Sequence, residues 1–179
     1  MKFSIDQNVA VGPDAAVAAY ANPAFYENRA PSGDISLVEV VSHEDTGPQT
    51  RLEVRYQFTG SVSSAVRAVV DPAKISWVTR TDVDKAQHRS SFVVLPDYYP
   101  DRLDCSGTFT FADAVPGADA ASGPGAASGP GAATLITIAG DLKVRVFLVG
   151  RTVEQLIVKG LRDYLEAEIA TVPGFIASA

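Results

Sequence analysis

The stretch LKVRVFLVGRTVEQLIVKGLRDYLEAEIATV, residues 142–172, changes its hydrophobic period from two to about 3.6. Before the change, apolar residues of one parity run from Ile136 to Leu148, which predicts an unusually long strand over residues 134–149. After it, apolar residues recur at i, i+3, i+4 and i+7, and charged residues fill the opposite side. The sequence therefore predicts that the last strand passes directly into a helix that packs back on the sheet.

The predicted helix has a marked start and end. Thr152 and Gln155 have the spacing of a capping box, so we expect the helix to begin there. Pro173 and Gly174 are expected to end it, because proline removes a helical hydrogen bond. Such a helix is roughly 30 Å long and can bury one stripe against an antiparallel sheet. Gly160 costs about 1 kcal/mol relative to Ala, which indicates close packing or room for another group, with close packing favoured.

Upstream of this stretch, the sequence predicts one strand, two short helices and five further strands. Phe3, Ile5 and Val9 share one side of the first strand, and Pro23 divides an Ala-rich stretch into two short helices. The five later strands are indicated within residues 34–45, 51–58, 74–84, 87–95 and 103–111, with a short helix between the second and third of them. Residues 34–45 are apolar on both parities, so their inward face is not assigned.

Residues 114–133 contain the hexapeptide SGPGAA twice in tandem and almost no side chain that could bury area. We expect a flexible loop within the last hairpin, because the strand and helix that follow are too little for a second core. The chain has 179 residues and is 46% hydrophobic, which is enough for one sizeable core. We therefore expect a single domain over residues 1–179.

Composition and charge argue against several classes of protein. The formal charge of -6 would repel a phosphate backbone, so no nucleic-acid partner is expected. The first residues show no signal-peptide pattern, and no apolar run approaches the length of a membrane span, so a cytoplasmic protein is expected. Cys105 is the only cysteine, which excludes a disulfide within the chain. The sequence does not indicate an oligomeric state.

The residues that carry metal or acid–base chemistry are few. His43 and His88 are the only histidines, and neither has metal-ligand spacing, so no metal site and no cofactor are predicted. Cys105 lies in an alternating segment where a small buried thiol is expected. His88 shares a parity with Phe92 and could point inward as a general base, but a solvated histidine at a strand end is the preferred interpretation.

One turn gathers polar and aromatic residues, and it has two interpretations. A pocket mouth is possible, but a turn stabilised by aromatic ring packing is preferred, because Pro and Asp favour turns. The residues concerned are Asp97, Tyr98, Tyr99, Asp101 and Arg102.

The predicted order of elements resembles the START-like superfamily, also called SRPBCC or helix-grip proteins. Two segments, SFVVLPDYYPDRLDCSGTFTF at 91–111 and GDLKVRVFLVGRTVEQLI at 140–157, are similar to an actinobacterial branch of unknown function. Phe147, where a proline is common in that branch, and the extended SGPGAA loop depart from its pattern. The resemblance implies an α+β helix-grip fold, in which a curved seven-stranded antiparallel sheet wraps a long C-terminal helix, with two short helices after the first strand.

The resemblance also implies a cavity between sheet and terminal helix that takes an apolar or amphipathic molecule such as a lipid, polyketide, quinone or sterol. The hydrophobic pattern alone is more typical of a filled core, and it does not distinguish the two. The candidate lining is apolar with a few polar tips, as ligand pockets commonly are. It comprises Tyr56, Phe58, Trp77, Phe92, Phe109, Val144, Val146, Leu161, Tyr164 and Leu165.

Three functions remain open on this basis. The preferred one is noncatalytic binding or carriage of a small hydrophobic ligand, driven by removal of apolar surface from water. The second is a cyclase- or dehydratase-like enzyme, which needs ionisable groups that converge inside the cavity. The third is an interaction module whose sealed core binds nothing.

Overall fold

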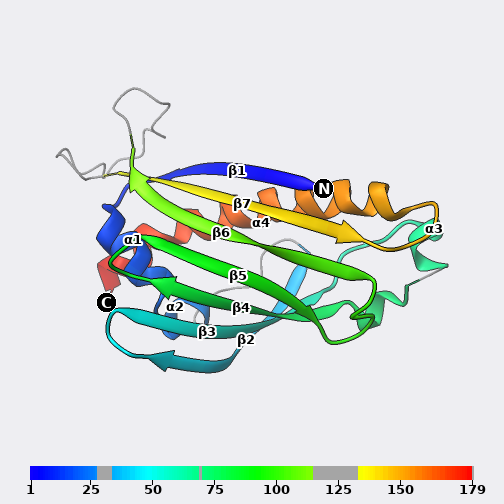
Figure 1. The fold of residues 1–179 in the computed structure, drawn as a ribbon, viewed down its shortest axis with the longest axis horizontal. Coiled ribbons are helices and arrows are strands. Elements are labelled where there is room, and N and C mark those ends of the chain that lie inside the picture. The colour runs from blue at the N-terminus through cyan, green and yellow to red at the C-terminus, as the bar shows by residue number, and fades with distance from the viewer. Residues whose placement is uncertain (28–33, 69, 115–132, 179) are drawn as a thin grey trace.

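The fold is taken from a computed structural model, which describes residues 1–27, 34–68, 70–114 and 133–178 (Figure 1). Seven strands, four α-helices and a short 3-10 helix follow one another along this part of the chain. In order they are β1 (Lys2–Val9), α1 (Pro13–Tyr20), α2 (Pro23–Glu27), β2 (Ile35–Asp45), β3 (Gln49–Phe58), α3 (Ser64–Arg67), the 3-10 helix η1 (Pro72–Lys74), β4 (Ser76–Asp84), β5 (Arg89–Pro96), β6 (Leu103–Asp113), β7 (Thr134–Val144) and α4 (Gly150–Ser178).

The strands form one antiparallel sheet in the order β1-β7-β6-β5-β4-β3-β2. This confirms the predicted sheet, with the two short helices inserted between its first and second strands in the chain. β6 and β7 pair up to Asp113 and Thr134, and the amide of Ala114 donates to the carbonyl of Ala133 at 3.0 Å. The flexibility predicted for the loop between them concerns residues 115–132, which lie outside the described part of the chain.

We call the face of the sheet on which α1 and α4 pack the inner face (Figure 1). The alternation predicted for β1 and β3 is confirmed, since Ile5, Val9, Leu52 and Val54 are buried there. β2 has no single parity because its pairing with β3 shifts at two irregular positions, the second of them between Val40 and Ser42. These irregularities explain why both parities of its sequence are apolar.

The predicted extent of the last strand is wrong. β7 ends at Val144, and residues 145–149 form a turn in which Leu148 has a φ of 66°. A residue in this left-handed region cannot continue a strand. The amide of Gly150 then donates to the carbonyl of Val146 at 2.9 Å and begins α4. The chain therefore needs five residues, rather than one glycine, to turn back over the sheet.

Two details predicted for the terminal helix are also wrong. α4 already includes Gly150, so Thr152 lies within the helix and does not cap it. A Cβ placed on Gly160 would meet nothing within 4 Å, so open space and not close packing surrounds this glycine. The helix thus starts one half-turn earlier than expected, at the end of a turn that the chain needs for reversal.

The predicted end of the helix is wrong as well, because α4 continues through Pro173 to Ser178. Pro173 has no amide to donate to the carbonyl one turn before it, which ordinarily ends a helix. The residues beyond it are held by packing. The ring of Phe175 lies 5.3 Å from that of Phe25 in α2, and Ile176 also packs against the core. Tertiary burial therefore overrides the local preference.

Candidate functional site

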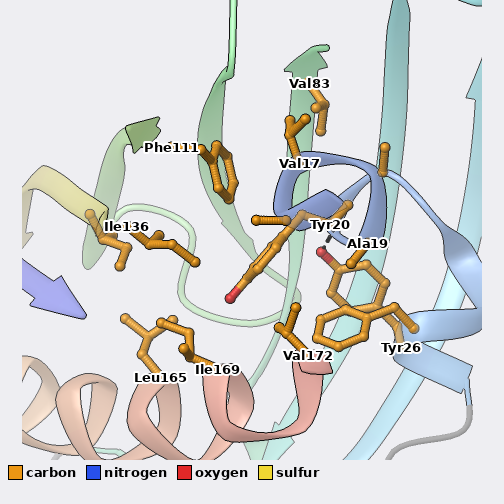
Figure 2. Packing of buried hydrophobic residues seen from close by; sticks show 14 of the residues in the cluster. Val17, Ala19, Tyr20, Tyr26, Val83, Phe111, Ile136, Leu165, Ile169 and Val172 are labelled. Carbon is orange, nitrogen blue, oxygen red and sulfur yellow. Dashed lines mark hydrogen bonds between the residues drawn. The ribbon is translucent and has the colours of Figure 1, made fainter. Parts of the chain in front are cut away.

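Burial on the inner face falls from one end of the sheet to the other. At one end, α1, α2 and the C-terminal half of α4 cover the strands completely (Figures 1 and 2). We call this end the closed half. Its buried side chains include Leu52, Val54, Val83, Phe111, Ile136, Ile138, Leu165, Ile169 and Val172.

Tyr20 of α1 stands between the strands and α4 in the closed half (Figure 2). Its ring lies 5.4 Å from that of Phe111 and 5.7 Å from that of Phe109. The hydroxyl of Tyr26 in α2 donates to the carbonyl of Tyr20 at 3.2 Å, which ties the two short helices together. The closed half is therefore a filled core.

The same strands become less buried toward the start of α4, and we call this end the open half. Phe58, Trp77, Val94, Cys105 and Val144 face inward there by strand parity and are only half-buried. Leu142, opposite Cys105 on β7, is the exception at 1% exposed. The helix follows the same trend: Leu165 is 3% exposed, Leu161 is half-buried and Ile157 is 37% exposed. Apolar side chains thus line an inner face that the described residues do not fully cover.

The structure brings the ten sequence-predicted lining residues to this inner face or to its edge. Tyr56, Phe92 and Leu165 are buried where the closed half meets the open half. The other seven are half-buried, and Val146 among them follows the end of β7; they are Phe58, Trp77, Phe109, Val144, Val146, Leu161 and Tyr164. Leu161 and Leu165 both pack against the core, so α4 lies on the sheet as the prediction required.

Three aromatic rings connect the sheet to α4. Tyr56 and Trp77 are directly opposite on β3 and β4, and their rings stack with centroids 5.7 Å apart and planes 17° apart. Tyr164 of α4 meets Tyr56 at 6.1 Å and 89°. These edge and stacked geometries are the favourable ones for aromatic pairs. The rings form a wall that is apolar on its faces and carries hydroxyl groups at its rim.

Two glycines occupy facing positions of the sheet beside this wall. Gly107 and Gly140 are directly opposite on β6 and β7, and both occupy inward positions. A Cβ on Gly107 would lie 2.2 Å from the carbonyl oxygen of Ala139 and 2.8 Å from the ring of Phe92. One on Gly140 would lie 2.6 Å from the carbonyl oxygen of Ser106 and 2.8 Å from the ring of Phe3. The missing side chains therefore allow the close approach of the neighbouring backbone and of two aromatic rings.

Glu168 is an acidic residue of the inner face that the sequence analysis did not identify. It is 3% exposed and lies on α4 one turn after Tyr164. Its position three residues after Leu165 places it on the same inward stripe. This spacing is the feature of the sequence that could have identified Glu168 as inward-facing. An acidic residue between Leu165 and Ile169 is unusual, because Glu is rarely fully buried.

Cys105 and His88, the residues considered for chemistry in the sequence analysis, take the structural roles that were preferred for them there. Burial raises the pKa of the Cys105 thiol to about 11, which leaves it protonated and unreactive near neutral pH, as the packing interpretation predicts. The side chain of His88 lies beside α1 and is 35% exposed. His88 adopts a φ of 48° in the turn before β5, and its Nε2 lies 2.7 Å from Oδ1 of the exposed Asp14. His88 is therefore a surface residue, in line with the preferred interpretation.

The turn between β5 and β6 also matches its preferred interpretation. Asp97 accepts hydrogen bonds from Arg55 at 2.9 Å and from Ser76 at 2.7 Å. The guanidinium of Arg102 lies over the ring of Tyr99 at 5.0 Å. These contacts use the charged groups of the turn to join neighbouring strands, as a structural turn requires.

A second depression, of about 520 Å³, is polar and lies at the opposite face of the sheet, near the start of the chain. Its lining of charges and a hydroxyl suits water better than an apolar molecule. The lining residues are Met1, Asp104, Ser106, Asp141, Lys143 and Glu154. Within the described residues, no cluster of His, Cys, Asp or Glu could hold a metal ion. No helix in that same part of the chain has the length and apolarity to cross a membrane.

Solved structures with the same arrangement of elements include three of different origin. A protein of Thermus thermophilus has a TM-score of 0.61 at 13% identity, and the alignment covers 99% of this chain and 98% of that one. The Zhui aromatase/cyclase from Streptomyces sp. R1128 has a TM-score of 0.61 at 12% identity, and the alignment covers 97% of this chain and 93% of that one. Norcoclaurine synthase from Thalictrum flavum, in complex with dopamine and hydroxybenzaldehyde, has a TM-score of 0.58 at 16% identity, and the alignment covers 97% of this chain and 87% of that one.

These likenesses establish the helix-grip fold. The search of curated protein sequences gave no match. A family model, by contrast, matches nearly the whole length of the chain, from residue 4 to residue 174, and thus includes β2 to β7, all but the first two residues of β1, and most of α4. The chain belongs to the family described as "Protein of unknown function (DUF2505)".

Proposed function

We propose that this protein binds a small hydrophobic or amphipathic molecule in the open half, between the sheet and α4, without catalysing a reaction. One observation carries the proposal: inward-facing aromatic and aliphatic side chains keep part of their surface exposed where the closed half ends. Covering such surface gains about 25 cal/mol for each Å² of apolar area removed from water. The seven predicted lining residues that stay partly exposed would supply that surface, and the buried Tyr56, Phe92 and Leu165 would form its inner limit. The described elements would act as one ligand-binding domain.

The aromatic wall of Tyr56, Trp77 and Tyr164 supports a planar or aromatic ligand. An aromatic face stacks on such rings more favourably than a flexible chain does. The norcoclaurine synthase structure with this fold holds two small aromatic molecules, which agrees with such a preference. An inner face that stays partly exposed also argues against an interaction module with a sealed core.

Native mass spectrometry of the protein as purified, followed by extraction of any bound species, tests the proposal. We expect a mass above that of the chain, which organic extraction converts to the mass of the chain alone and a hydrophobic compound. Repeated recovery of empty protein, together with no binding of the amphipathic aromatic dye anilinonaphthalene sulfonate, would refute the proposal.

A catalytic role is the second candidate, because Glu168 and Tyr164 lie one turn apart on the inward stripe of α4. Glu168 lies in the closed half between Leu165 and Ile169, so Tyr164 would contact a bound molecule and Glu168 would act through it. The two candidates differ when the extracted compound is returned to the protein. A carrier leaves the compound unchanged. A cyclase- or dehydratase-like enzyme converts it, and the Glu168→Gln variant would lose this conversion. The cytoplasmic location and the actinobacterial branch stay predictions.

A further inference from the structure

The middle of α4 presents two basic and two acidic side chains on one side of the helix. All four are exposed and have the spacing i, i+3, i+4 and i+7, which places residues on a single side of a helix. They are Lys159, Arg162, Asp163 and Glu166, and we call this set the charged face. Among the described residues, none of them forms an ion pair. The charge along this face changes sign once, between Arg162 and Asp163.

The order of these charges is not the one that best stabilises a helix on its own. Opposite charges four residues apart stabilise a helix better when the acidic residue comes first. In α4 the basic residue comes first in both pairs, since Lys159 precedes Asp163 and Arg162 precedes Glu166. A partner outside the chain therefore explains the charged face better than the stability of α4 does.

The elements that pack against α4 direct their charged side chains elsewhere. β1 and β7 bury alternate residues such as Ile5 toward the helix, and their charged residues have the opposite parity and point away from it; these are Lys2, Asp6, Asp141 and Lys143. Asp14 of α1 lies beside His88. Within α4, the carboxylate of Glu154 accepts a hydrogen bond from the amide of Val144 at 2.9 Å. The sign change along the charged face is thus not offset by its neighbours.

We propose that two copies of this chain pair through the charged face of α4, with the two helices antiparallel. A two-fold axis between Arg162 and Asp163 brings each of these residues opposite the other one in the second copy. The same axis brings Lys159 opposite Glu166 of the second copy, so every charge of the face meets one of opposite sign. Parallel helices would bring like charges together, which disfavours association. The charged face is therefore self-complementary, as a two-fold interface requires.

The surface next to the charged face allows two helices to approach closely. Gly160, Ala167 and Ala170 are exposed, and a Cβ on Gly160 would meet nothing within 4 Å. No contact among the described residues thus requires a glycine at this costly helix position, whereas small residues bring two helix axes to within about 8–10 Å. The proposed register also places Leu156, which is 55% exposed, near Ala170 of the second copy, where its apolar surface would leave water.

The pairing goes beyond the binding function and does not require the open half to be occupied. It uses the side of α4 that is turned away from the sheet, so the inner face stays accessible. The formal charge of -6 on each copy opposes association. At physiological ionic strength this repulsion is screened beyond about 8 Å, whereas the facing charges of the two helices lie in contact.

Sedimentation equilibrium of the full chain tests the pairing. We expect the wild type to dimerise with a dissociation constant of about 100 μM or below. That constant should rise at least tenfold between about 0.1 M and 1 M salt, because the Debye length falls from about 10 Å to about 3 Å. Lys159→Glu with Arg162→Glu makes the charged face wholly acidic, and Asp163→Lys with Glu166→Lys makes it wholly basic. Each double variant should be monomeric alone, and an equimolar mixture of the two should form a mixed dimer.

Lys74→Glu with Arg89→Glu is the matched control, because it makes the same change in net charge at exposed positions of η1 and β5. This control should dimerise as the wild type does. A wild type that stays monomeric at about 100 μM would overturn the proposal. So would a dimer that both charge variants retain, or two folded charge variants that fail to associate when mixed. If a charge variant does not fold, a wild-type dimer that salt strengthens would equally overturn it.

Discussion

The rings of Tyr56 and Trp77 stack across β3 and β4 at a centroid distance of 5.7 Å, and Tyr164 of α4 meets the first of them edge-on. This contact joins β3 and β4, near the β2 edge of the sheet, to the middle of α4. On one side of it lies a filled core, and on the other several inward-facing side chains stay partly exposed. The aromatic wall is therefore the place where a bound molecule would meet the fixed part of the fold.

Trp77→Ala should weaken dye or ligand binding at least tenfold, which corresponds to about 1.4 kcal/mol, because the stacked surface of the wall is lost. The loss of stability should be smaller than the roughly 3–5 kcal/mol that is typical of a fully buried Trp, since Trp77 is only half-buried. A binding titration followed by the fluorescence of the dye anilinonaphthalene sulfonate measures the affinity. Trp77→Phe is the control and should retain most of it; an unchanged affinity in Trp77→Ala would exclude the wall from the site.

Stability should fall as the pH rises from 9 to 11 because of Cys105. Burial raises the pKa of its thiol from 9.0 to about 11, so the folded chain keeps a proton that the unfolded chain releases. The thiol's stabilising contribution is complete below pH 9 and is lost as the pH passes 11, with a total on the order of 2–3 kcal/mol. Urea unfolding at pH 9 and at pH 11 measures this loss of stability. Cys105→Ser, which has no such titration, should show a smaller fall; an identical fall would contradict the assignment.

Pro173→Ala should raise the free energy of unfolding by about 1–3 kcal/mol, because alanine restores the missing helical hydrogen bond in a helix that already continues to Ser178. Thermal and urea unfolding measure the change. Gln155→Ala, at an exposed position of the same helix, is the control and should alter stability by less than about 0.5 kcal/mol. A destabilised Pro173→Ala would mean that the proline is needed for the docking of Phe175 on α2.

The elements that the sequence predicted well are those in which local period and burial agree. β3 is an example, because Leu52, Val54 and Tyr56 alternate with charged residues and are buried. The ends of α4 could not be predicted, since the turn before Gly150 and the packing of Phe175 depend on residues distant in the chain. Local propensity does not contain such tertiary terms.

The candidate site was predicted in part for the same reason. Strand and helix parity placed Trp77 and Leu161 on the inner face, but parity does not say how far a face is covered. The open half follows from where α1 and α2 lie, which is a long-range property of the chain. Glu168 was missed because a stripe defined by apolar residues passes over a carboxylate that shares its spacing.

The free energy of unfolding of Cys105→Phe, compared with that of Cys105→Ser, tests the open half most directly. Cys105 faces inward from β6 and is half-buried, so a larger side chain there should fill unoccupied space. Our account predicts that the two variants differ by less than about 0.5 kcal/mol. A loss of about 1–3 kcal/mol in Cys105→Phe, the cost typical of overpacking, would show that the inner face is a filled core and would contradict the account.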